Sequence, residues 1–208
     1  MNSLHVLLPL AAYLIGSIPF GLLLSRRSGI DIRQHGSGNI GATNVSRLVG
    51  KKIGFLTLLF DAAKGWLPVV LTPWLLDNDP SQNIITAFCG AAAVTGHMFS
   101  IFLRFKGGKG VATALGVFLA LSLKALLISI PVFLLLAFTT GFVSLGSLLA
   151  SAAVLPALYF LSEPSWKLWL AAFIVLLIWI KHHQNIQRLL NGTEKRFNDK
   201  EPIHQKTV

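Results

Sequence analysis

The sequence predicts an all-α polytopic membrane protein with seven transmembrane helices, a periplasmic N-terminus and a cytoplasmic C-terminus. Of its 208 residues, 53% are apolar and only 12% are charged, and the mean hydropathy is +0.66. This composition is far more apolar than that of a soluble domain. The apolar residues form segments suited to crossing about 30 Å of hydrocarbon. Lysine and arginine residues gather in alternate connecting segments, as the positive-inside rule requires.

Seven apolar segments are the candidate spans. To within a few residues they are Leu4–Leu24, Ile53–Leu76, Ile84–Leu103, Val111–Leu123, Ala125–Thr140, Ser144–Leu161 and Trp166–Ile180. The first segment has no basic region before it and no small-residue cleavage motif after it, so we expect a helix of the mature protein and not a signal peptide. Pro19 predicts a kink within this helix.

Residues 111–140 allow two interpretations, either one long helix kinked at Pro131 or two spans separated near Ser122. The distribution of charge favours two spans. With seven spans, all Lys and Arg residues except Lys64, Lys124 and Lys167 fall in cytoplasmic segments. Those segments are residues 25–52, 104–110, 141–143 and the tail from 181 onward. Six spans would place the basic tail in the periplasm, against the positive-inside rule.

Residues 1–197 are expected to form a single integral-membrane domain, followed by a short polar cytoplasmic tail at 198–208. Cys89 is the one cysteine, so an intramolecular disulfide and a cysteine metal cluster are excluded. The net charge of +10 is scattered between apolar spans. Nucleic-acid binding requires a continuous basic face, so we expect no nucleic-acid partner.

Two polar, glycine-rich stretches interrupt the apolar pattern on the cytoplasmic side. In the first, at 36–44, glycines permit positive φ and hydroxyl and amide side chains surround them, with Arg47 three residues beyond. Guanidinium groups bind phosphate in a bidentate manner. The stretch contains Gly36, Ser37, Gly38, Asn39, Gly41, Thr43 and Asn44. It predicts an anion site, although an ordinary turn-rich loop would have a similar composition.

The second stretch holds Lys106, Gly107, Gly108, Lys109 and Gly110, and leads into a helix that begins near Val111, with Thr113 in its first turn. A helix N-terminus offers unpaired N–H groups and partial positive charge. Glycine follows Lys109, so the Walker A pattern of nucleotide hydrolases is absent. We therefore predict a short phosphate-binding turn. The alternative is a turn whose lysines lie at the level of the lipid headgroups.

Other polar groups accompany these stretches. His97 ends the third span, and His182 and Asn185 lie three apart after the last span, where a helix would place them on one face. Histidines near a membrane interface are often structural, but two beside two anion sites favour a role there. Asp61 and Lys64, spaced i, i+3 in the second span, either neutralise each other or let Asp61 orient a basic group. Carboxylates do not cluster with the histidines, so no metal site is expected.

The ordered motifs resemble those of the bacterial acyl-phosphate:glycerol-3-phosphate acyltransferase family, PlsY, over almost the entire chain. The motifs are Gly36-Ser37-Gly38-Asn39-x-Gly41-Ala42-Thr43-Asn44-x-x-Arg47, Gly96-His97 through Phe105-Lys106-Gly107-Gly108-Lys109-Gly110-Val111-Ala112-Thr113, Ser144-Leu145, and His182-x-x-Asn185-Ile186-x-Arg188-Leu189. Ser100 and Lys181 depart from the usual proline and arginine of this family. The loss of the arginine fork makes a specific role for Lys181 doubtful.

This resemblance implies transfer of an acyl group from acyl phosphate to the 1-hydroxyl of sn-glycerol 3-phosphate, giving lysophosphatidic acid and phosphate in phospholipid synthesis at the bacterial inner membrane. It also implies a soluble phosphate acyltransferase partner, PlsX, and no cofactor. We expect the chemistry to rest on Ser37, Arg47, Lys109, His97, His182 and Asn185. Substrate or phosphate binding is expected of Gly38, Asn39, Thr43, Asn44, Lys106, Gly107, Gly108, Gly110, Thr113 and Ser144. Structural roles are expected of Asp61, Lys64 and Glu194.

The chemistry of the residues agrees with this reaction. An acyl phosphate is a mixed anhydride with a good leaving group, so a protein nucleophile is not required. Two phosphorylated substrates account for two anion-binding stretches. We expect direct attack by the glycerol hydroxyl, with the donor phosphate accepting the proton, although a protein base is the alternative. Phe102 is the fifth residue after His97, so the His-x-x-x-x-Asp motif of other glycerolipid acyltransferases is absent.

Two other classes of protein fit less well. A transporter for phosphate or an organophosphate would place its site near the membrane midplane between internal repeats, and the sequence shows no repeat. A non-catalytic scaffold would leave the paired glycine-rich stretches unexplained. Acyl-chain preference, oligomeric state and the assignment of each phosphate to a stretch are not predicted by the sequence.

Overall fold

The computed structural model describes residues 3–197 and 199, so the predicted tail at 198–208 lies, apart from Asp199, outside the described residues. Every regular element in this part of the chain is helical. The elements are α1 (Leu4–Ser17), α2 (Phe20–Ser25), η1 (Arg26–Ser28), α3 (Ala42–Leu48), α4 (Lys51–Leu75), α5 (Gln82–Met98), η2 (Ile101–Leu103), α6 (Val111–Leu121), α7 (Leu123–Thr140), α8 (Val143–Phe160), α9 (Ser165–Lys181) and α10 (His183–Leu190).

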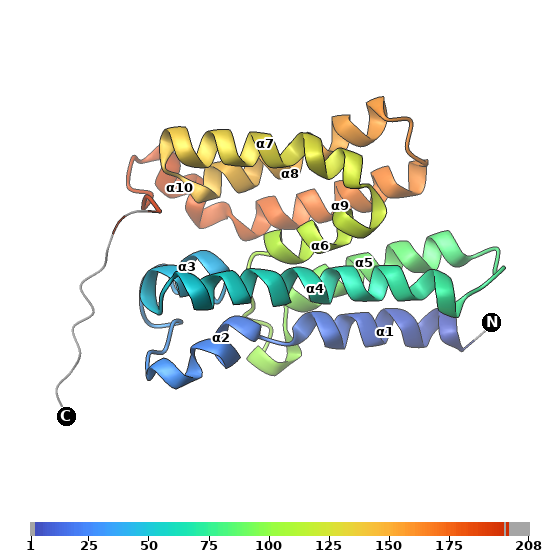
Figure 1. Cartoon of the computed structure of the whole chain (residues 1–208), viewed down its shortest axis with the longest axis horizontal. Helices are drawn as coiled ribbons and strands as arrows, with labels where there is room; N and C mark the ends of the chain where they lie inside the picture. The colour runs from blue at the N-terminus through green and yellow to red at the C-terminus, as the bar shows by residue number, and fades with distance from the viewer. Residues whose placement is uncertain (1–2, 198, 200–208) are drawn as a thin grey trace.

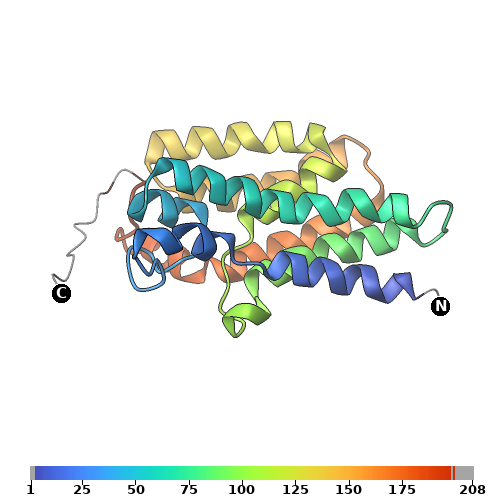
Figure 2. The same ribbon diagram turned by 60° about the horizontal axis from the view of Figure 1, so that its bottom comes forward.

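The long helices lie side by side along one axis and form a bundle, as two views of the structure show (Figure 1 and Figure 2). Helices α1, α4 and α5 make one side, α7, α8 and α9 make the other, and α6 lies between them. The short helices α2, α3 and α10 gather at one end, and α1 begins at the opposite end. The main core joins α5, α6, α8 and α9 through fully buried aliphatic side chains that include Val94, Val117, Leu158 and Ile174.

The first predicted span is interrupted as Pro19 suggested. Helix α1 ends at Ser17 and α2 begins at Phe20. Because proline cannot donate a backbone hydrogen bond, carbonyl groups before it lose their helical partners. At this break the carbonyl of Ile18 accepts from the ammonium group of Lys64 on α4 at 2.8 Å and from the N–H of Phe20 at 3.1 Å.

The chain between 111 and 140 forms two helices and not one kinked helix. Helix α6 ends at Leu121, α7 begins at Leu123, and the hydroxyl of Ser122 between them accepts the N–H of Ala125. Pro131 lies inside α7. A serine at an N-cap satisfies a first-turn donor, which explains why the new helix begins here.

Within the part of the chain that the structure describes, five helical segments are suited by length and composition to crossing a membrane, or six if α9 and α10, which meet at 59°, form one broken span. Helix α6 has 11 residues. It is about 16 Å long and shorter than the hydrocarbon layer. All seven predicted apolar segments thus contain a helix, but α6 is too short to be identified as a span by its length. These properties are those of a multi-pass membrane protein.

Candidate functional site

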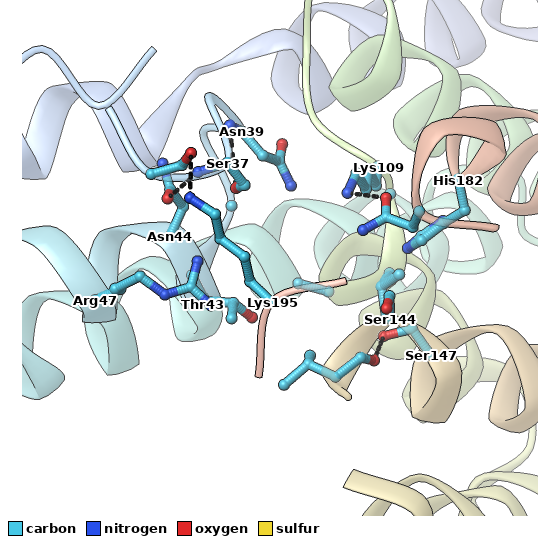
Figure 3. Close-up of a pocket in the computed structure, with 18 of the residues that line it drawn as sticks. Ser37, Asn39, Thr43, Asn44, Arg47, Lys109, Ser144, Ser147, His182 and Lys195 are labelled. Atoms are coloured by element: carbon cyan, nitrogen blue, oxygen red, sulfur yellow. Dashed lines mark hydrogen bonds between the residues drawn. The ribbon is translucent and has the colours of Figure 1, made fainter. Parts of the chain in front are cut away.

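A polar cavity of about 300 Å³ lies at the end of the bundle that carries α3 and α10. Figure 3 shows how its walls face each other. Ser37, Asn39 and Arg47 come from the first glycine-rich stretch and α3, whereas Lys109 and His182 come from the opposite wall. Residues separated by more than 140 positions in the sequence thus share one cavity.

The first stretch is held in shape by Asn44. This side chain is only 2% exposed, and its amide donates to the carbonyls of Ile32 at 2.9 Å and His35 at 3.2 Å. Its oxygen accepts the N–H of Ser37 at 2.9 Å. All its main hydrogen-bonding capacity is therefore used within the loop, and the expected binding role of Asn44 becomes one of shaping the loop.

The glycines of this stretch have different roles. Gly36 and Gly38 have φ angles of +66° and +68°, as expected for a tight loop, and Gly38 does not line the cavity. Gly41 instead has a φ of −77° and directly precedes helix α3, so it does not use the positive φ that glycine permits. Residues 42–48 form that helix, which places Thr43 and Arg47 one turn apart on the cavity side.

One nitrogen of the Arg47 guanidinium is hydrogen-bonded to the protein, and another has no partner among the described residues. Its Nη2 donates to the carbonyl of Arg196 at 3.2 Å. Its Nε is buried and has no hydrogen-bond partner among the described residues. A buried donor without a partner is costly unless a ligand or water accepts from it. Arg47 is therefore prepared to bind an anion in the cavity.

The second glycine-rich stretch differs from the prediction. The N–H groups of Gly107 and Gly108 donate to the carbonyls of Met98 and His97, at 3.2 and 3.0 Å. A Cβ atom on Gly108 would lie 2.2 Å from Nε2 of His97. These glycines therefore allow close packing against the end of α5, and their N–H groups are not the free donors that the prediction of a phosphate-binding turn assumed.

Two more residues of this stretch lie away from the cavity. Lys106 is exposed and does not line it. Thr113 is completely buried and packs against Gly65 of α4. Gly110, with a φ of +82°, and the first residues of α6 do line the cavity. The N-terminus of α6 therefore supplies the partial positive charge that the sequence predicted.

Lys109 is the central cation of this wall. Its ammonium group donates a hydrogen bond to the side-chain oxygen of Asn185. Burial lowers the pKa of Lys109 to about 8, Glu194 opposes this effect, and Arg188 and Lys181 add to it. Near neutral pH the side chain therefore carries its charge but holds its proton less firmly than a surface lysine.

Glu194 links several of the surrounding elements. Its Oε1 accepts from Ser144 and from Asn185, both at 2.6 Å, and its Oε2 accepts from Nε of Arg188 at 2.7 Å. Burial opposes ionisation of Glu194, but these hydrogen bonds and the arginine charge outweigh it and lower its pKa. The carboxylate thus connects α8, α10 and, through Asn185, Lys109, in keeping with the structural role expected of it.

The two histidines are buried in different surroundings. Nδ1 of His182 donates to the carbonyl of Ile178 at 2.8 Å, which leaves Nε2 of the neutral ring as an acceptor. Nδ1 of His97 lies 3.7 Å from Oδ1 of Asp61, which is also 2.9 Å from the ammonium group of Lys64. Asp61 therefore both pairs with Lys64 and faces a basic group, so the two predicted alternatives are geometrically compatible.

Sequence reasoning missed two cations of the cavity, Arg188 and Lys195. Arg188 belongs to the last motif and lies three residues after Asn185, so a helical reading of this motif would have placed both on one face. Lys195 lies in an irregular segment after α10, where no local pattern indicates its direction.

A second, apolar cavity of about 250 Å³ adjoins the polar one between α6, α7, α8 and α9. Thr43, Leu58, Val111, Phe133 and Ser147 line both cavities. A cavity with cationic side chains thus lies next to an apolar one and shares lining residues with it, which suits a ligand with a charged head and a hydrocarbon chain. Within the described residues, no group of histidine, cysteine and carboxylate side chains is arranged to hold a metal ion.

Comparison with known proteins agrees with this geometry. The family model for glycerol-3-phosphate acyltransferase matches residues 6–192. The chain belongs to the glycerol-3-phosphate acyltransferase family. A relative with that name from Desulfotalea psychrophila is 54% identical, and the match covers 92% of this chain and 98% of the relative. One from Geobacter sulfurreducens is 46% identical, with 93% and 97% covered. The resemblance to the PlsY family is thereby confirmed.

Solved structures of this acyltransferase family have the same fold. A crystal structure of PlsY (YgiH), an integral membrane glycerol 3-phosphate acyltransferase in its glycerol 3-phosphate form, superposes with a TM-score of 0.87 at 42% identity, covering 93% of this chain and 96% of that one. The lysophosphatidic acid form superposes with a TM-score of 0.85 at 41% identity, covering 92% and 94%. The helical membrane architecture of this chain is therefore that of an acyltransferase of known structure.

Proposed function

We propose that this protein transfers the acyl group of acyl phosphate to the 1-hydroxyl of sn-glycerol 3-phosphate, giving lysophosphatidic acid and inorganic phosphate. The observation that carries this proposal is that a cavity with four cationic side chains adjoins an apolar cavity and shares lining residues with it. Arg47, Lys109, Arg188 and Lys195 line the first, and aliphatic side chains line the second. Both substrates carry a phosphate, and only the donor carries the acyl chain.

The reaction proceeds without a covalent enzyme intermediate. The glycerol oxygen attacks the acyl carbonyl carbon, the bond from that carbon to the phosphate oxygen breaks, and the departing phosphate takes the hydroxyl proton. A serine nucleophile would need a neighbouring general base such as histidine. The hydroxyl of Ser144 instead donates to Glu194, which agrees with a reaction that uses no serine nucleophile at this position. Lys109, Arg47 and the N-terminus of α6 stabilise charge on the phosphates, and confinement in one cavity aligns the reactants.

The acyl chain of the donor occupies the apolar cavity. Val111 and Ala112 line both cavities at the N-terminus of α6, so a phosphate bound at this helix end places the attached chain between α6 and α8. His182, with Nε2 free to accept, orients a substrate hydroxyl or a protonated phosphate oxygen. Burial of each methylene group contributes about 0.8 kcal/mol to binding.

The protein crosses the bacterial inner membrane seven times, with the N-terminus in the periplasm and the cavity toward the cytoplasm. Consecutive long helices alternate in direction, and the end that carries α3 and α10 also carries most of the basic residues. Short helix α6 begins at the cavity and completes its crossing together with the loop before it. Thiol labelling of Ser3→Cys and Asn191→Cys in a Cys89→Ser background tests this topology: only Ser3→Cys should react with an impermeant reagent in intact cells.

A membrane enzyme of this kind requires a soluble supplier of acyl phosphate. We expect that supplier to be the phosphate acyltransferase PlsX. The decisive experiment uses the purified protein in detergent with glycerol 3-phosphate and one of three donors, palmitoyl phosphate, palmitoyl-CoA or palmitoyl acyl carrier protein. Lysophosphatidic acid and phosphate in equal amounts from palmitoyl phosphate alone would support the proposal. Product from either thioester, or none from any donor in folded protein, would reject it.

A further inference from the structure

Residues Thr193–Phe197 form an irregular segment after α10, which we name the C-terminal strap. Two of its residues, Glu194 and Lys195, line the cavity, and Figure 3 shows Lys195 among the lining side chains. Its far end lies on the turn between α7 and α8. The strap therefore lies between the site and a part of the bundle that does not line the site.

Three contacts anchor the far end of the strap. The N–H of Phe197 donates to the carbonyl of Gly141 at 2.9 Å, and the ring of Phe197 meets that of Phe138 edge to face at 6.3 Å. The guanidinium of Arg196 lies 5.8 Å from the ring centre of Phe142. Edge-to-face pairs and cations over rings are favourable arrangements.

Gly141 makes this close approach feasible. Its φ is +80°, and a Cβ atom there would lie 3.2 Å from the side chain of Arg196. A larger residue would meet both backbone strain and this contact. The turn between α7 and α8 is thus shaped to receive the strap.

The inner side of the strap contacts Arg47 directly and Lys109 through Asn185. The carbonyl of Arg196 accepts from Nη2 of Arg47 at 3.2 Å. Glu194 accepts from Asn185, whose oxygen accepts from Lys109. One five-residue segment therefore supports the guanidinium of one wall and the ammonium of the other.

We propose that Phe197 is a positioning residue, which fixes the strap on the α7–α8 turn and thereby sets the positions of Arg47 and Lys109 without touching substrate. This inference rests on the proposed acyltransferase function. It adds a group that lies outside both cavities and outside the ordered motifs of the sequence. A strap that detaches would let Arg47 and Asn185 move, and misplacement of about 1 Å costs an enzyme much of its rate.

Detachment also has an electrostatic consequence at Lys109. The charged and titratable groups that face this lysine are Glu194, Arg188, Lys181 and His182. Only Glu194 favours the protonated form, and the other groups disfavour it when charged. Since Glu194 belongs to the strap, movement of its carboxylate away from Lys109, with Lys109 still buried, would lower the pKa of Lys109 further. Activity that needs the protonated amine would then decline at lower pH than in the wild type.

The test compares Phe197→Ala and Phe138→Ala, singly and together, in the purified full-length protein with palmitoyl phosphate and glycerol 3-phosphate. Phe160→Ala is the matched control, because Phe160 also forms an edge-to-face aromatic pair, with Tyr159, at the end of α8 and outside both cavities. Each strap variant should lose about ten-fold in kcat/KM, on the order expected for a displaced binding group. The double variant should lose no more than about the larger single loss, because both changes break one contact.

The alkaline limb of the pH–rate profile provides a second reading. It should move to lower pH in Phe197→Ala, return toward the wild-type position in Phe197→Tyr, and stay unchanged in Phe160→Ala. Thermal unfolding identifies variants that do not fold, and for these the milder Phe197→Leu is measured instead. An unchanged rate and pH limb in folded Phe197→Ala or Phe197→Leu would overturn the proposal, as would independent losses that multiply in the double variant. An inactive wild type would instead reject the acyltransferase function itself.

Discussion

Asn44 holds the first glycine-rich loop through the N–H of Ser37, which its side-chain oxygen accepts at 2.9 Å. Its amide nitrogen donates to two carbonyls of the same loop. Replacement by alanine leaves these buried groups unpaired, at a cost of about 1–3 kcal/mol. We expect Asn44→Ala to lower the melting temperature and to raise KM for glycerol 3-phosphate.

Asn44→Asp separates the contribution of the side-chain oxygen, which accepts a hydrogen bond, from that of the amide nitrogen, which donates two. It keeps the acceptor for Ser37 but presents an oxygen to the carbonyls of Ile32 and His35, so it should be at least as harmful as alanine. Asn83→Ala, at an exposed position of α5, serves as the control. Aspartate that behaves like the wild type in both assays would show that the amide nitrogen does not hold the loop.

Gly108→Ala should disable the second loop by steric conflict. The added Cβ would lie 2.2 Å from Nε2 of His97, so the loop that carries Lys109 must move. We expect a loss of at least about ten-fold in kcat, measured at saturating substrates. Gly29→Ala is the comparison, because a Cβ there meets nothing within 4 Å even though the φ angle is +72°. Equal activity of both variants would show that the close packing of Gly108 against His97 is not needed to position Lys109.

Lys109→Ala should reduce turnover about 100-fold or more, as the loss of a preorganised charge does elsewhere. In the wild type, activity should fall as pH rises through about 8, where Lys109 loses its proton. Lys109→Arg, if active, should lack this limb because arginine stays charged. A wild-type rate that stays level from pH 7 to 10 would show that activity does not require the protonated form of Lys109.

The same pKa has the opposite effect on folding. The folded-state pKa of Lys109 is about 8, below the 10.5 of an unperturbed lysine. Between these values the unfolded chain binds more protons than the folded one, so this group alone makes the free energy of unfolding increase with pH. The test measures denaturant unfolding of the wild type and of Lys109→Met in detergent at pH 7 and pH 10. The increase in the free energy of unfolding that Lys109 causes should be present in the wild type and absent from Lys109→Met.

Ala150→Phe should restrict the length of the acyl chain. Ala150 lines the apolar cavity, and a phenyl ring there would fill part of the space assigned to the chain. We expect kcat/KM to fall about ten-fold or more for palmitoyl phosphate and much less for butyryl phosphate. Leu149→Phe, on an exposed neighbouring position, should leave the ratio unchanged. A uniform loss for both donors in Ala150→Phe would place the chain elsewhere.

The sequence predicted some parts of this site because they are local. Ser37, Asn39 and Arg47 lie close together in the chain, so a short loop and one helical turn bring them to the same wall. His182 and Asn185 are likewise three residues apart and share a face. The free N–H groups assigned to Gly107 and Gly108 failed as a prediction, because the partners that accept from them belong to the end of another helix.

Apolar segments, charge distribution and ordered motifs were sufficient to predict a helical multi-pass membrane protein and its family, because hydropathy and motif order are properties of the chain itself. The cavity required the folded bundle. Arg47 meets Arg196 across 149 positions, and Lys109 meets Asn185 across 76. Contacts of this range follow from how helices pack, and packing depends on the shapes of all neighbouring side chains at once. For this reason the strap and the apolar cavity appeared only when the helices were assembled.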